Sequence, residues 1–438
     1  MGEPSALATA SVGVRSVAQA TPSRETRPPG QTLVARTEFG PFDLLSDLAH
    51  AYYVEGFSAR AVEACRQWVR LTDEAGDLAT SRYLRYIEAI GLQELGRHAE
   101  AAEVSGALLA SLGDAWEPVW RAKALAMVAQ SSVRLGEHGR AIAAMAEADW
   151  LVRTVPPGSY GHLSASMAVA LALRAVNLLE QADELLSRIG AGANPTVAML
   201  VVQERALLSA YWGTTLWLIG HADEAGQHFV TAAGRARHMQ RLAVAVGNDS
   251  MAARAEVIEA FAATHLGEEA LGEVRALAAA DRFTARPELI ETHLLKLVLG
   301  RAAARAGDAS AAHEHLSTMV AEADAAGREM WAAAGMATLA DVEGERQGSH
   351  LGMDLWRSVA RGALARTWSE REGRFAALRD RNRLRQLTAE TDRIGEAMLQ
   401  DPLTGLGNRR RLDLALGDAE PESAVFIDVD DFKAVNDA

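Results

Sequence analysis

Hydrophobic residues recur with helical spacing along most of the chain, and the runs are interrupted by glycine. Segments such as VAQSSVRLGEHGRAIAAMAEA and TTLWLIGHADEAGQHFV place apolar residues three and four positions apart on both sides of that glycine. Such spacing is typical of amphipathic helices. Glycine tolerates the left-handed conformation that ends a helix at a tight reversal. The pattern therefore predicts pairs of helices, each pair joined at a glycine.

The joining residue recurs at nearly constant intervals. The markers are Gly56, Gly96, Gly136, Asn177, Gly220, Gly267 and Gly307. They are separated by 40, 40, 41, 43, 47 and 40 residues. Asparagine is the next most tolerant residue for this conformation, so Asn177 fits the series. We expect a repeat protein in which each helix pair buries its apolar face by stacking on its neighbours, as a right-handed α-superhelix.

The markers and the segments LGRHAEAAE, LGEHGRAIA and IGHADEAGQ resemble the tetratricopeptide repeat superfamily, over residues 41–350. The interval is longer than the family's unit of about 34 residues, which implies a long-repeat type. The resemblance implies a groove for a protein, a peptide or a small-molecule signal.

Two sets of side chains in the repeats have alternative interpretations. Histidines follow three of the markers, at His98, His138 and His221. They could be a row of metal ligands, but their recurrence is better explained by equivalent positions in diverged repeats. Trp116, Trp120, Trp212 and Trp217 could line a groove, but packing between repeats is favoured.

Residues 351–400 predict a long connecting helix without proline. Its apolar or neutral positions form two sets: Leu364, Trp368, Phe375 and Leu378, then Leu384, Leu387, Thr391, Ile394 and Met398. The second set alternates gaps of three and four, as in a coiled coil. We expect a homodimer through 355–400, with a register slip between Leu378 and Leu384 that could act as a switch point. Nine arginines between positions 357 and 385 are interpreted as a solvated face rather than a nucleic-acid patch.

The last segment, 401–438, combines two local motifs. In DPLTGLGNRRRL, Pro402 should end the connecting helix, and a new helix should begin at Asn408 to Arg410. AVFI then predicts a buried strand, after which Asp428 and Asp430 share a face. Paired carboxylates there suit Mg²⁺, and the helix opened by Phe432 and Lys433 suits phosphate. The residues alone equally allow Asp430 or Asp431 to be a helix cap.

Together, DPLTGLGNRR and FIDVDDFKAVND resemble the opening of the GGDEF domain of bacterial diguanylate cyclases, which join two GTP into cyclic di-GMP. The resemblance implies that Asp428 and the backbone carbonyl of Val429 bind Mg²⁺ or Mn²⁺. It also implies that Phe432 and Lys433 contact the GTP phosphates and that Asn436 reads the guanine. We expect 401–438 to be a truncated start of that domain, without a complete catalytic set and inactive in this chain. The alternative is a non-catalytic scaffold with a degenerate GGDEF domain.

Composition limits the remaining possibilities. A formal net charge of -14 disfavours nucleic acid as a partner. The single cysteine, Cys65, rules out an internal disulfide framework and is expected to be buried. No apolar run is long enough for a membrane span, and residues 1–40 predict a disordered leader. The expected fold class is mostly α, followed by a truncated α/β start, in a cytoplasmic protein.

Overall fold

The computed structural model describes residues 41–189, 195–348 and 350–418. The predicted leader, residues 1–40, lies outside this part of the chain. So does 419–438, which holds the predicted strand AVFI and every predicted metal and nucleotide residue. Within the described residues the elements are helices, and one isolated antiparallel bridge joins Gln400 to Gly407.

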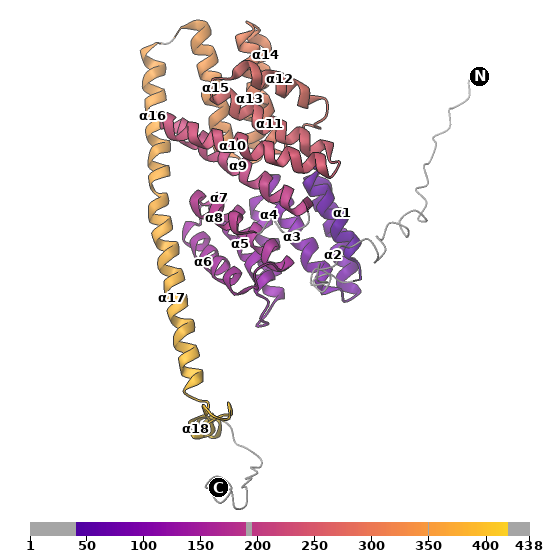
Figure 1. The fold of residues 1–438 in the computed structure, drawn as a ribbon, viewed down its shortest axis with the longest axis vertical. Coiled ribbons are helices and arrows are strands. Elements are labelled where there is room, and N and C mark those ends of the chain that lie inside the picture. Colours follow the sequence, from indigo (N-terminus) through magenta and orange to yellow (C-terminus); the bar gives the residue numbers. More distant parts are fainter. Residues whose placement is uncertain (1–40, 190–194, 349, 419–438) are drawn as a thin grey trace, which may run out of the picture.

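Fifteen helices form the repeats, α1 to α8 at one end and α9 to α15 at the other (Figure 1). The first group is Asp43–Val54 (α1), Ser58–Glu74 (α2), Leu78–Glu94 (α3), His98–Ser111 (α4), Pro118–Arg134 (α5), His138–Thr154 (α6), Tyr160–Ala175 (α7) and Leu179–Arg188 (α8). The second is Pro195–Ile219 (α9), Ala222–Ala245 (α10), Asp249–His265 (α11), Glu269–Ala280 (α12), Ile290–Arg305 (α13), Ala309–Ala325 (α14) and Glu329–Gln347 (α15). Consecutive helices pack on one another, as expected for a tetratricopeptide-like helical-repeat superhelix.

The seven predicted markers all adopt the left-handed conformation. Their φ angles run from 60° at Asn177 through 71° at Gly96 to 91° at Gly220. At Gly96 the backbone N–H donates to the carbonyl of Gln93 at 3.0 Å, and the next N–H, of Arg97, donates to Leu92 at 2.9 Å. These bonds satisfy carbonyls that the end of α3 would otherwise leave free. The predicted repeat and its markers are confirmed.

Small residues allow paired helices to approach closely. A Cβ added to Gly213 in α9 would lie 2.9 Å from the Phe229 ring of α10. A Cβ on Gly300 in α13 would lie 2.6 Å from the Leu316 side chain of α14. Both distances are too short for a real contact, so the large residue of one helix fills the space that glycine leaves in the other.

The superhelix closes on itself, because its first helices touch its last. Arg254 of α11 donates to the carbonyl of Val54, at the end of α1, at 3.0 Å. Arg328, just before α15, pairs with Glu94 at the end of α3. The partners are 200 and 234 residues apart in sequence, so these contacts are properties of the assembled superhelix rather than of any single repeat.

The connecting segment is a pair of nearly continuous helices, Leu351–Ser369 (α16) and Arg371–Ala397 (α17). α16 packs on α9 and α17 packs on α6. In Figure 1 this connector descends along the repeats, extends beyond them and leads to Arg409–Asp418 (α18). The helix end before Pro402 and the restart after Asn408 are confirmed.

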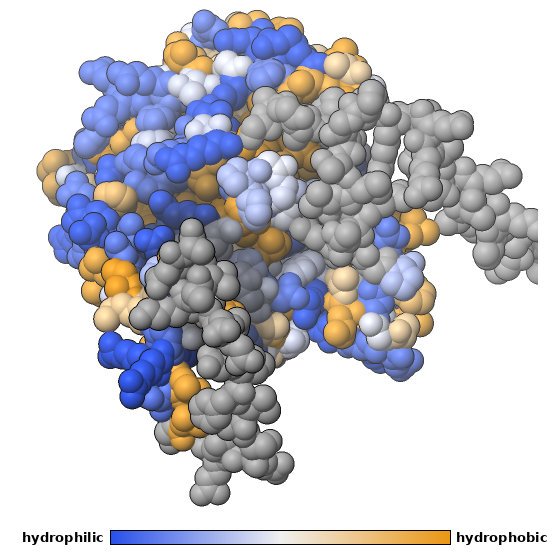
Figure 2. Space-filling view, turned by 60° about the horizontal axis from the view of Figure 1, so that its bottom comes forward, coloured by the Kyte–Doolittle hydropathy of each residue, from blue (hydrophilic) through white to orange (hydrophobic). Residues whose placement is uncertain are grey.

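The outer surface is mixed. Figure 2 shows hydrophilic residues over most of one face, with hydrophobic residues between them in small groups. In the part of the chain that the structure describes, no helix has both the length and the apolar character that crossing a bilayer requires.

Substitution of two marker glycines tests the closure. We expect Gly136→Ala to cost about 1 kcal/mol, the penalty of a left-handed alanine, because nothing lies within 4 Å of its new Cβ. Gly96→Ala should cost more, since its Cβ would lie 2.6 Å from the carbonyl oxygen of Ala325 in α14. Urea unfolding followed by circular dichroism measures both. Equal midpoint shifts for the two variants would show that α3 and α14 do not meet.

Candidate functional site

Three neighbouring cavities lie where early helices of the repeats, such as α5 and α7, meet later ones, such as α9, α13 and α15. Their volumes are about 430, 110 and 100 Å³. The first and second share Ala175 and Tyr211 as lining residues, and the second and third share Gln93 and Leu207. They therefore adjoin one another, and we call them together the inner channel.

The first of these cavities, of about 430 Å³, lies between the repeats and the connector, and we call it the connector pocket. The connector contributes Leu364, Thr367, Trp368 and Arg374 to its lining. Trp368 is 9% exposed, and the Arg371 guanidinium lies 4.2 Å from the centre of its ring. Arg371 also pairs with Glu180 of α8 at 3.4 Å. The connector thus forms one wall of a cavity whose other walls belong to four repeats.

Tyr211 of α9 lies at the centre of the charged groups in the connector pocket. Its hydroxyl donates to Asn177 Oδ1 at 3.0 Å. Burial raises the pKa of Tyr211, and three nearby guanidinium groups, those of Arg134, Arg174 and Arg374, act in the opposite direction. The pocket that Tyr211 lines also contains two of these cations, Arg134 and Arg374.

The opposite end of the inner channel is acidic. The third cavity is lined by Glu94, Glu204, Glu288 and Glu291, with only Arg174 and Arg254 as cations. Burial raises the pKa of Glu204, although Arg174, at 3.3 Å, favours the ionised form. Along the channel the lining charge thus changes from negative to positive towards the connector.

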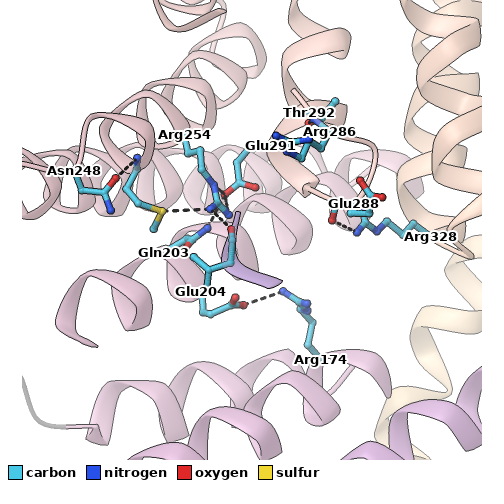
Figure 3. Close-up of polar contacts among 12 residues, drawn as sticks. Arg174, Gln203, Glu204, Asn248, Arg254, Arg286, Glu288, Glu291, Thr292 and Arg328 are labelled. Carbon is cyan, nitrogen blue, oxygen red and sulfur yellow. Dashed lines mark hydrogen bonds and ion pairs between the residues drawn. The ribbon is translucent and has the colours of Figure 1, made fainter. Parts of the chain in front are cut away.

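Figure 3 shows the polar contacts that build this acidic end. Glu291 of α13 accepts from Gln203 of α9 at 2.7 Å and from Arg254 of α11 at 3.1 Å, and all three side chains are buried. Arg328 donates to the carbonyl of Pro287 at 3.0 Å and also to the carbonyl of Glu288. These bonds fix the loop before α13 against the neighbouring repeats.

Several buried polar atoms along the channel have no protein hydrogen-bond partner. They are both ring nitrogens of His98, Nε2 of Gln130 and Nε of Arg374. Desolvation lowers the pKa of His98, so the neutral ring is favoured. An unmade buried hydrogen bond costs about 1–3 kcal/mol. A polar ligand in the channel would recover part of that cost.

The connector docks on α6 through one face of α17. Leu378 is 4% exposed, Asn382 Nδ2 donates to Asp149 Oδ2 at 2.6 Å, and Arg385 pairs with Glu147 at 3.1 Å. At about 100° per residue these three positions lie within about 60° of one another. We call them the docking face.

The predicted coiled-coil positions lie on the opposite side of α17. Leu384, Leu387, Ile394 and Met398 are 64%, 45%, 53% and 56% exposed. They centre about 180° from the docking face at about 100° per residue. We call them, with Thr391, the seam. The two apolar sets on either side of the expected register slip, which end at Leu378 and begin at Leu384, thus lie on different faces of α17. The role of this slip as a switch point stays a prediction.

The arginines of the connector are only partly a solvated face. Arg379 is 69% exposed at its side chain and fits that expectation. For Arg371 and Arg385 the expectation is wrong, since they pair with acids of α8 and α6. Those acids lie about two hundred residues earlier, so the connector sequence alone gave no sign of them.

The predicted nucleotide residues Asp428, Val429, Phe432, Lys433 and Asn436, with Asp430, lie outside the described part and stay predictions. The turn that leads to them is described. Asp401 Oδ1 accepts from the backbone N–H groups of Leu403 and Thr404 at 3.1 and 2.9 Å, which lowers the pKa of Asp401. Asn408 Nδ2 donates to the carbonyl of Met398 at 2.8 Å. The motif thus ties the start of α18 to the end of α17.

The histidines singled out in the sequence are not gathered with other possible ligands in the described part of the chain, and three of the four tryptophans pack inside the repeats. No group of three or more His, Cys, Asp or Glu side chains within the described residues could hold a metal ion. Trp120 is buried, Trp212 stacks on His228 at 4.0 Å, and Trp217 meets His265 edge-on at 5.1 Å. These three contribute to packing, whereas Trp116 is 67% exposed.

Comparison with known proteins gives no family. No family model matches the chain, and no curated protein matches it. The solved structure "Crystal Structure of Rap Protein Complexed with Competence and Sporulation Factor" aligns at 14% identity and a TM-score of 0.41, covering 81% of this chain and 98% of that one. "Crystal structure of APC/C hetero-tetramer Cut9-Hcn1" aligns at 14% identity and a TM-score of 0.22, covering 75% and 89%. The fold assignment therefore comes from the helix pairs of this chain itself.

Truncating the docking face tests the position of the connector. Leu378→Ala removes the buried leucine, and we expect amide hydrogen exchange across 371–385 to become at least about tenfold faster because the helix leaves α6 more often. The matched control is Arg381→Ala on the exposed side of the same helix. Mass spectrometry of peptides from this segment measures both. Unchanged exchange in the leucine variant would mean that α17 does not dock.

Proposed function

We propose that the chain is a binding module in which the inner channel takes an extended segment of a partner and the connector relays its presence. The observation that carries this proposal is that the connector forms one wall of the connector pocket, through Trp368 and Arg374. A ligand in that cavity necessarily touches, or is excluded by, the helix that leaves the repeats. Binding and connector position are then linked by the ligand's differential affinity for the two arrangements.

The dimensions and chemistry of the channel suit a peptide. The connector pocket, at about 430 Å³, falls in the usual size range of ligand sites, and the two smaller cavities continue from it. Gln130 has a buried Nε2 without a protein partner, which can donate to a backbone carbonyl of an extended chain. The Nε2 of Gln93 already donates to the carbonyl of Met127 at 3.1 Å, so Gln93 offers its Oε1 as an acceptor. The apolar side chains between them offer positions for ligand side chains.

A synthetic random heptapeptide library tests the binding function. We expect it to yield peptides that bind the chain and lose binding to Ala175→Trp, because Ala175 lines two adjoining cavities and the indole would fill them. The matched control is Val274→Trp in α12, where the side chain is 65% exposed and lies outside the channel. Peptides that bind both variants equally, or a library that yields no binder, would contradict the proposal.

We also propose an output for the connector, a GGDEF-type diguanylate cyclase that uses GTP with Mg²⁺ or Mn²⁺. Its support is the ordered pair of motifs DPLTGLGNRR and FIDVDDFKAVND. Asp428 and the carbonyl of Val429 would hold the metal, Phe432 and Lys433 the phosphates, and Asn436 the guanine. The second candidate is a non-catalytic scaffold with a degenerate domain, which the helical-repeat fold supports better than it supports a cyclase.

A homodimer through the seam completes this proposal. The seam exposes four large apolar side chains on the side of α17 that faces away from the repeats, at heptad spacing. Two copies could pair there while each connector stays docked on its own α6. A cyclase that joins two GTP needs two nucleotide sites facing each other, and a paired α17 would bring them together.

The product of the complete open reading frame tests the dimer and the output together. We expect Leu387→Asp to give a monomer by light scattering and to abolish cyclic di-GMP formation from GTP and Mg²⁺, because a charge in the seam opposes pairing. Asp428→Asn should abolish product and leave the dimer intact. A dimer in the first variant would exclude the seam, and a product-free wild type would favour the scaffold.

A further inference from the structure

We propose that the connector pocket binds the carboxylate of an amphipathic ligand between Arg134 of the repeats and Arg374 of the connector. The inference rests on the proposed binding function and names the chemistry that the inner channel selects at its connector end. The bound anion would join two parts of the chain that otherwise meet mainly through α6 and α9.

The cations of this pocket are poorly neutralised by the protein. The only carboxylate in the lining is Glu329, whose side chain is 85% exposed and lies 3.7 Å from Arg134. Arg374 has Glu370 at 3.8 Å, its Nη2 donates to the carbonyl of Thr367 at 3.1 Å, and its Nε is buried with no hydrogen-bond partner. Both acids are exposed and lie at long range, where an ion pair contributes about 0–1 kcal/mol. Two donors with free hydrogen-bonding capacity therefore face the cavity.

The surroundings of Arg374 favour an incoming anion. Its side chain is 20% exposed. Desolvation lowers the pKa of Arg374, so burial disfavours the charged form that the arginine nevertheless carries. A carboxylate that accepts from the guanidinium supplies a charge-assisted hydrogen bond in place of lost water.

The rest of the pocket requires an apolar body behind the anion. The apolar side chains of the lining belong to both parts of the chain: Val133, Ile142, Val176, Leu218, Met330 and Trp368. Inorganic anions would leave these surfaces uncovered. A ligand with a carboxylate at one end and an aliphatic or aromatic body fits both features.

The charge gradient along the inner channel sets the direction of a longer ligand. The far cavity is lined by four glutamates and two arginines, which disfavours an anion there. A peptide would therefore lie with its C-terminal carboxylate in the connector pocket and its N-terminus towards Glu204 and Glu291. A small carboxylic acid would occupy the connector pocket alone.

Occupancy of this site would favour the docked connector. Arg374 lies one helical turn before Leu378 of the docking face, so an anion held by Arg374 positions the turn that leads into that face. Such a ligand binds the docked form better than the undocked one, and by linkage it raises the docked population.

Matched pairs of acid and amide probes test the inference on the full chain by calorimetry. The pairs are 4-phenylbutyrate with its amide, and library-selected heptapeptides with a free or an amidated C-terminus. We expect at least one pair to favour the acid by about tenfold, and Arg374→Gln to abolish that preference. Arg374→Lys should keep part of it, and Arg381→Gln, a matched exposed arginine on α17, should keep all of it. The preferred acid should also slow hydrogen exchange across 371–385, whereas its amide should not.

The outcomes separate this inference from the proposed function. Preference for the acid peptide identifies a chain terminus as the source of the carboxylate, and preference for phenylbutyrate identifies a small acid. Either supports the inference. If peptides lose binding to Ala175→Trp but bind the wild type equally as acid and amide, the anion site is contradicted and the proposed binding function is still supported. If peptides bind Ala175→Trp as well as they bind the wild type, both proposals are contradicted.

Discussion

Two buried arginines join early helices of the superhelix to late ones around the inner channel. Arg254 joins α11 to the end of α1 and to Glu291 of α13, while Arg328 joins the loop before α13 to the end of α3. Removing one partner of a buried ion pair typically costs about 3–5 kcal/mol, because the other charge is left unpaired. A stack of helix pairs without these ties would bury its apolar faces equally well, yet it would leave an open groove.

The contact between early and late repeats also explains why the connector packs over a cavity rather than on a flat surface. The turns that carry Gly136 and Asn177 and the start of α15 at Glu329 line one pocket only because late repeats return to early ones. The connector follows directly after α15 and covers that pocket with Trp368. Its α17 then presents the docking face to α6 and the seam to solvent. One helix can therefore respond to the repeats and still be free to pair with a second copy.

The sequence predicted what local chemistry determines. Seven turns could be located because a left-handed residue at a helix end needs glycine or asparagine, and even Asn177 followed that rule. In the same way, Pro402 predicted the end of α17 and Asn408 predicted the start of α18. Local sequence patterns could not reveal the candidate site, because Arg134, Tyr211 and Arg374 come from helices far apart in the chain. The surface that Leu378 meets could not be predicted for a related reason: its partner, α6, is distant in sequence, and apolar spacing alone does not say which surface a leucine contacts.

The strength of connector docking decides whether a ligand could control it. Burying Leu378 contributes about 1.5–3 kcal/mol. The Arg385–Glu147 pair is about one-third exposed at both side chains, so it adds about 0–1 kcal/mol. The Asn382–Asp149 bond adds about 1.5–3 kcal/mol because its acceptor is charged. Ordering the helix on α6 opposes these terms. Each of these contacts contributes at most about 3 kcal/mol, the size of a typical coupling free energy between two sites, so a ligand that binds the docked form better can shift the position of the connector.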